Sequence, residues 1–175
     1  MAGGTTTTAF KKIDVQGTKT YILPLPATAW TDCSAAITAI HAGKEAMCPQ
    51  TLGDLTRTRE VTEYGCISSN DSQKAAGKMS YGDITLELLF APDDTAGQKL
   101  LFDAMEGNTP VIIAMEAPNA DTSVGSTGAS GDIIWTKAMV VGDAISFPAN
   151  GLVGYSVTVS PYGGFTRCAA IKGTT

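Results

Sequence analysis

Residues 83–90, DITLELLF, alternate between polar and apolar side chains along most of their length. Successive side chains of a β-strand point to opposite faces, so this period of two predicts a strand with one face on a core and one on solvent. The polar face would carry Asp83, Thr85 and Glu87. The apolar residues that we expect in the core are Ile84, Leu86, Leu88 and Phe90.

A helix is predicted directly after this strand, ending at Gly107. Thr95 and Gln98 have the spacing of a capping box, with the Thr95 hydroxyl serving the Gln98 amide. Asp93 and Asp94 would lie at the positive end of the helix dipole. The expected apolar stripe of this helix is Gly97, Leu100, Leu101, Ala104 and Met105, with Leu101 and Met105 as core residues.

The rest of the C-terminal half reads as strands separated by turns. Residues 109–116 form a nearly continuous apolar run, typical of a buried strand, and residues 117–131 are small and polar, typical of a loop. Residues 132–147 and 152–160 predict a hairpin around the turn at 148–151. On its last strand, Tyr155 and Val157 share one face and are expected in the core.

The N-terminal half is less clearly patterned. Residues 1–18 predict a flexible arm, residues 21–23 a short edge strand, and residues 55–67 a strand. Residues 30–41 suit either a strand or a short helix. Residues 68–78 are polar and predict a loop, extended here to 68–80, and residues 163–175 predict a loose tail.

Together these elements predict one mainly β domain over residues 19–162. We expect two packed antiparallel sheets, in a sandwich or barrel, flanked by one α-helix. A chain of 175 residues is long enough to bury a core of this kind.

Charge and cysteine content limit the environment and the partners. The net charge of −5 disfavours tight, nonspecific clamping of nucleic acid. No apolar run is long enough to span a membrane and the N-terminus has no signal core, so we expect use without Sec export and no membrane insertion. The cysteines are then expected to be reduced thiols. One alternative stays open, a disulfide between Cys33 and Cys48 across a hairpin turning near His41.

No group of residues predicts catalysis. His41 is the single histidine and has no motif around it, so we interpret it as a turn or surface residue. Residues 125–131, GSTGASG, have the small residues of a phosphate loop but lack its Gly-Lys-Ser/Thr ending. We expect no enzyme activity, no cofactor and no metal.

Several segments resemble the major tail tube proteins of long-tailed phages with non-contractile, lambda-like tails. They are TREVTEYG (58–65), ITLELLFAPDD (84–94), AGQKLLFDAMEG (96–107) and the hairpin DIIWTKAMVVGDAISFPANGLVGYSVTVSPYG (132–163). The helix start D-x-x-x-G-Q-x-L and the last strand G-Y-S-V-T-x-S carry the local likeness. The resemblance covers roughly residues 20 to 162.

This resemblance implies a structural virion protein. Hexameric rings of the family stack into a hollow tube around a tape measure protein, and double-stranded DNA passes through the tube during ejection. Further partners would be the tail terminator and the baseplate or tip proteins. The protein would be assembled in the host cytoplasm and end in the virion tail. Alternatives are a head-tail joining or capsid-decorating β-sandwich, or a tube protein like that of type VI secretion.

Two sets of surface residues follow from this hypothesis. The polar strand face is expected to line the lumen through Asp83, Thr85 and Glu87, because a sheet with one polar face can wall a water-filled channel. The segment 68–80, together with the N-terminal arm and the C-terminal tail, is expected to contact the next ring. The contact candidates in that segment are Ser69, Asn70, Asp71, Gln73, Lys74 and Lys78.

Overall fold

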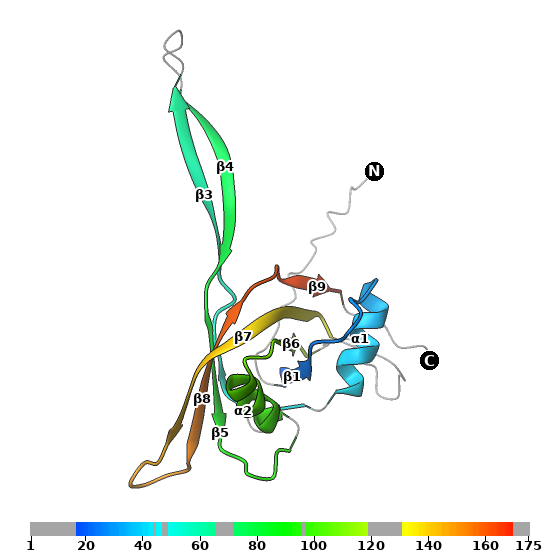
Figure 1. The fold of residues 1–175 in the computed structure, drawn as a ribbon, viewed down its shortest axis with the longest axis vertical. Helices are drawn as coiled ribbons and strands as arrows, with labels where there is room; N and C mark the ends of the chain where they lie inside the picture. Colours follow the sequence, from blue (N-terminus) through cyan, green and yellow to red (C-terminus); the bar gives the residue numbers. More distant parts are fainter. Residues whose placement is uncertain are drawn as a thin grey trace, which may run out of the picture.

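A curled antiparallel sheet of seven strands forms the body of the protein (Figure 1). The computed structural model describes residues 17–43, 45–46, 49–65, 72–95, 97–118 and 131–169. The strands of this sheet are β1 (Lys19–Pro24), β2 (Pro49–Leu52), β5 (Ile84–Leu89), β6 (Val111–Glu116), β7 (Ile133–Ser146), β8 (Gly154–Pro161) and β9 (Thr166–Cys168). Their order is β1-β6-β7-β8-β5-β2, and β9 pairs with the start of β7.

The prediction of a mainly β, antiparallel fold is confirmed, and two of its details are corrected. The described strands form one curled sheet and a separate two-stranded hairpin, rather than two sheets packed face to face. The described part of the chain contains two helices instead of one: α1 (Cys33–Ala42) and α2 (Gly97–Gly107). The alternation of residues 83–90 could not distinguish these arrangements, because a helix covers an apolar sheet face as well as a second sheet does.

A long hairpin projects from the body along the longest axis of the molecule (Figure 1). It consists of β3 (Arg57–Gly65) and β4 (Ser72–Tyr81), which pair only with each other within their sheet. The strand predicted over 55–67 is therefore present. The loop predicted over 68–80 is wrong for most of its length, since Ser72–Tyr81 is strand. Its Ser, Gln, Lys and Gly residues have low β propensity, and pairing with β3 overrides that preference.

Helix α1 resolves the ambiguity that the sequence left over residues 30–41. Asp32 adopts an extended conformation, and its side chain accepts a hydrogen bond from the Ala35 amide at 2.8 Å, which caps the helix. The helix then buries Ala36, Ile37 and Ile40. His41 lies in its last turn, not in a hairpin turn.

Helix α2 begins almost where the sequence predicts, with a different capping residue. Asp94, rather than Thr95, accepts hydrogen bonds from the amides of Gly97 at 2.7 Å and Gln98 at 3.1 Å. The Gln98 side chain turns back to bond the carbonyl of Leu89 and the amide of Ala91, tying the helix start to the end of β5. The helix ends at Gly107, as predicted.

The sheet has a separate apolar cluster on each of its faces. Leu101 and Ala104 of α2 pack against one face, and Ile37 and Ile40 of α1 pack against the other. Strand β6 contributes alternate residues to both clusters, which is why residues 111–114 are continuously apolar. Strands β5 and β8 reach only the α2 cluster, so their opposite faces remain uncovered by the helices.

Most of the residues expected in the core lie in the α2 cluster. Buried members of that cluster are Ile84, Leu86, Leu88, Leu101, Tyr155 and Val157. Phe90 is only half-buried and packs against the edge of the cluster. Met105 departs from the expectation, because its side of α2 turns to solvent and leaves it 38% exposed.

A disulfide joins Cys33 at the start of α1 to Cys168 on β9, 135 residues later. The expectation of reduced thiols is therefore wrong for these two residues, and so is the alternative pairing of Cys33 with Cys48, which lies outside the described residues. The segment predicted as a loose tail is thus anchored at 166–168 by β9 and this bond. Among the described residues, no helix is long and apolar enough to cross a membrane.

Candidate assembly surface

The exposed face of β5 and β8 is lined with carboxylates and hydroxyls. Asp83, Thr85 and Glu87 are all exposed, while the residues between them are buried. On β8, Thr158 lies opposite Thr85 and Ser156 opposite Glu87. The Ser160 hydroxyl donates to a carboxylate oxygen of Asp83 at 2.6 Å. The three candidates therefore belong to one polar surface that extends over two neighbouring strands.

The structure divides the candidate contact residues of the 68–80 segment into two groups. Gln73, Lys74 and Lys78 lie on β4 and are exposed. Lys74 forms an ion pair with Glu63 across the hairpin at 2.7 Å. The remaining candidates, Ser69, Asn70 and Asp71, lie outside the described residues.

An exposed apolar surface, which the sequence analysis did not predict, lies at the tip of the β7–β8 hairpin. Phe147 is 75% exposed and Leu152 is 71% exposed, and Ile145 and Val141 are also exposed. The signal was present in the sequence, since residues 145–152, ISFPANGL, place large apolar residues on both sides of a turn. A turn normally carries polar side chains, so exposed Phe and Leu at this position indicate a surface that another protein covers.

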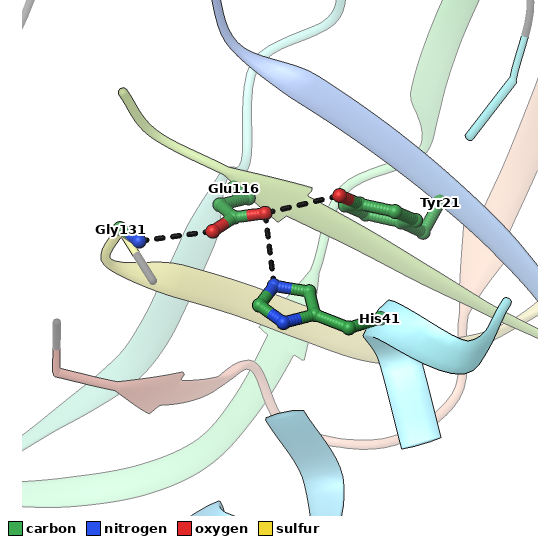
Figure 2. A network of polar contacts seen from close by, with 4 residues as sticks. All are labelled: Tyr21, His41, Glu116 and Gly131. Carbon is green, nitrogen blue, oxygen red and sulfur yellow. Dashed lines mark hydrogen bonds and ion pairs between the residues drawn. The ribbon is translucent and has the colours of Figure 1, made fainter. Parts of the chain in front are cut away.

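A buried carboxylate, that of Glu116, ties α1 to the sheet (Figure 2). Glu116, the last residue of β6, accepts hydrogen bonds from the Tyr21 hydroxyl at 3.1 Å and the Gly131 amide at 2.9 Å, and it also contacts His41 Nε2 at 3.1 Å (Figure 2). A Cβ atom at position 131 would overlap the carbonyl oxygen of Ala117, so glycine allows this close approach.

This network has the properties of a structural clasp. Burial and the negative charge of Glu116 raise the pKa of Tyr21 well above its usual value, so the hydroxyl remains a donor. The contact between His41 and Glu116 joins α1 to β6, and the hydrogen bond from Tyr21 to Glu116 joins β1 to β6. Within the described part of the chain, no group of three or more His, Cys, Asp or Glu side chains is arranged to hold a metal ion.

Comparison with known proteins gives a likeness in fold but none in sequence. No protein-family model matches the chain, and no curated protein matches it. Among solved structures, a chain of the SPP1 tail tube is 15% identical, with a TM-score of 0.58, over 94% of this chain and 80% of that one.

Chains of two further assemblies are similar in fold. A chain of the anti-feeding prophage baseplate is 11% identical, with a TM-score of 0.61, over 94% of this chain and 98% of that one. A chain from the sheath/tube terminator of the extracellular contractile injection system PVC is 15% identical, with a TM-score of 0.62, over 91% and 99%. This chain therefore has a fold that is also found in the SPP1 tail tube, in the anti-feeding prophage baseplate and in the PVC sheath/tube terminator.

Proposed function

We propose that this chain is a structural subunit that stacks in rings to form a phage tail tube. The observation that carries the proposal is the likeness in fold, which covers 91–94% of this chain in matches to the SPP1 tail tube, the anti-feeding prophage baseplate and the PVC sheath/tube terminator. The exposed hairpin β3–β4 supports it, because an isolated two-stranded hairpin is only marginally stable in water and needs a partner surface.

In this proposal the polar face of β5 and β8 lines the lumen. Asp83 and Glu87 give that face negative charge, while Thr85, Thr158 and Ser156 add hydroxyls. A carboxylate-lined wall repels phosphate, so double-stranded DNA passes without binding to it. The tape measure protein occupies the same channel before ejection.

The β3–β4 hairpin makes the contact between rings. Gln73, Lys74 and Lys78 are exposed on β4. This strand has ten residues, which at the usual rise per residue gives a length of about 30 Å. That length carries the hairpin well beyond the body of its own subunit. Ser69, Asn70 and Asp71, which lie outside the described residues, stay candidates for the same contact.

The finer features of the proposal follow the lambda-like resemblance of the sequence. The rings are hexameric, the tail is non-contractile, and the tube meets a terminator at one end and baseplate or tip proteins at the other. The protein assembles in the host cytoplasm and ends in the virion. No turnover of a substrate is part of this function.

A hairpin deletion with an intact body tests the proposal. Arg57 and Tyr81 lie opposite each other at the base of the hairpin, so an Asn-Gly turn replacing residues 58–80 closes the strands without removing body residues. In negative-stain micrographs of concentrated protein, the full chain should give stacked rings or tubes. The deletion variant should remain folded by circular dichroism and give no long tubes. Persistent monomers or trimers of the full chain would contradict the proposal.

A further inference from the structure

The projecting hairpin and the rest of the molecule carry opposite net charge. On β3 and β4, four basic and two acidic residues give a net charge of +2. The described residues outside this hairpin include four basic and twelve acidic side chains, a net charge of −8. The hairpin residues concerned are Arg57, Arg59, Lys74, Lys78, Glu60 and Glu63. A basic arm on an acidic body is complementary to the body of a second copy.

The core face of the sheet continues past the residues that cover it. Ile145 lies opposite Tyr155, which is 1% exposed, so both side chains are on the α2 face of the sheet. Phe147 follows directly after the end of β7, two residues beyond Ile145, and is 75% exposed. Asp143 lies opposite the buried Val157, on the same face, and is exposed. This surface, which we term the apolar tip, therefore combines two large apolar side chains with a carboxylate.

The hairpin and the apolar tip lie at opposite ends of the same line of strands. Strand β4 ends at Tyr81 and β5 continues from Ile84, while Leu89 at the far end of β5 lies opposite Gly154 of β8. The 147–152 turn therefore projects away from the β3–β4 hairpin (Figure 1). Two unlike surfaces at opposite ends of one chain favour a head-to-tail contact, which builds a filament when its repetition does not close into a ring.

We propose that the β3–β4 hairpin of one copy docks on the apolar tip of a second copy. Val61, which is 55% exposed on β3, would pack against Ile145 and Phe147, and the net positive charge of the hairpin would face Asp143. This rests on the proposed function and deepens it by naming the receptor for the hairpin. The contact weakens as salt rises, because exposed charges are screened.

Two variants, each defective at one end, test this contact. The hairpin variant is Val61→Ser with Lys78→Glu, and the tip variant is Phe147→Ser. All three side chains are exposed, so both variants should keep the fold. A control variant, Tyr162→Ser with Lys19→Glu, reverses one exposed lysine and replaces one exposed large side chain by serine elsewhere on the molecule.

Sedimentation velocity and micrographs of the wild type, each variant and their mixture give the result. We expect the wild type and control to stack, and each variant alone to need at least about tenfold more protein to do so, as truncating a central contact residue commonly causes. In a mixture, the intact hairpin of the tip variant can dock on the intact tip of the hairpin variant. The mixture should therefore give particles twice the size of those that either variant forms alone, and these particles should not extend further.

The other outcomes overturn the inference in distinguishable ways. If the wild type stacks and either variant stacks equally well, or the mixture gives no paired particles, the docking contact is wrong and the tube function stands. If the hairpin serves nucleic acid instead, self-association of nucleic-acid-free protein will not respond to the hairpin substitutions. If the wild type does not associate at all, the proposed function fails together with the contact.

Discussion

The disulfide between Cys33 and Cys168 should account for a large share of the stability of the oxidised monomer. The bond closes a loop that spans 135 residues. In the chain-entropy description, closing a loop of that length removes about 5 kcal/mol of unfolded-state entropy at 25 °C, and measured disulfides typically contribute about 2–4 kcal/mol. Cys33→Ser should therefore lower the free energy of unfolding by about 2–5 kcal/mol.

Cys33 is the better residue to change, because it is exposed, whereas Cys168 is fully buried in the apolar cluster between α1 and the sheet. Replacing Cys33 leaves the packing around Cys168 intact, so the measured loss reports the cross-link and not a cavity. The assay is urea unfolding followed by circular dichroism, at concentrations where the protein is monomeric, with and without a phosphine reductant.

The control for this experiment is Thr31→Ser, an exposed position two residues before Cys33, which should leave stability unchanged in oxidising buffer. Under reductant, the wild type and the Cys33→Ser variant should unfold at the same urea concentration. In oxidising buffer, the wild type and Cys33→Ser could instead differ by less than about 0.5 kcal/mol in free energy of unfolding, as ordinary surface substitutions do. That result would show that the disulfide does not stabilise the monomer.

Three further predictions concern the clasp, the alkaline limit and the sheet. Glu116→Ala should cost about 2–4 kcal/mol in urea unfolding, because it leaves buried donors without an acceptor, and Glu116→Gln should cost less. Burial raises the pKa of Tyr21 and of Tyr155, with help from neighbouring carboxylates, so the folded state holds both protons after the unfolded chain has lost them. The stabilisation is then fully present below about pH 10, and above it the free energy of unfolding should fall by up to about 1.4 kcal/mol per pH unit for each tyrosine. Tyr21→Phe should make this fall less steep in urea unfolding at alkaline pH. An unchanged slope in the variant would contradict the prediction. Leu86→Ala should cost about 2–5 kcal/mol and its exposed neighbour Glu87→Ala less than about 0.5 kcal/mol; equal costs in thermal unfolding would mean that the strand faces are reversed.

Burial along β5 was predictable because its alternation is local to one strand. Leu86 and Glu87 are adjacent in sequence, and their opposite environments follow from the period of two alone. The same holds for the continuous apolar run of β6, which is buried on both faces of the sheet. Helix α2 was also found, although its cap moved by one residue from Thr95 to Asp94.

The features that were missed depend on contacts between distant residues. Strand β4 has little β propensity of its own and is a strand because β3 lies beside it. Cys33 and Cys168 are brought together by the packing of α1 beside β9. The lack of a signal core at the N-terminus led to the prediction of reduced thiols, which is wrong for this pair. Ile145 and Phe147 are exposed because no other described element packs over that end of the β7–β8 hairpin, and the hairpin sequence does not contain that information.

A cryo-electron microscopy reconstruction of the assembled protein would place the polar face of β5 directly. We expect a hollow tube of stacked rings, in which Asp83, Thr85 and Glu87 face the lumen and the residues between them face the interior of the subunit. A tube with Glu87 on its outer wall would contradict the assignment of the polar face. Concentrated protein that forms no rings would contradict the tube function itself.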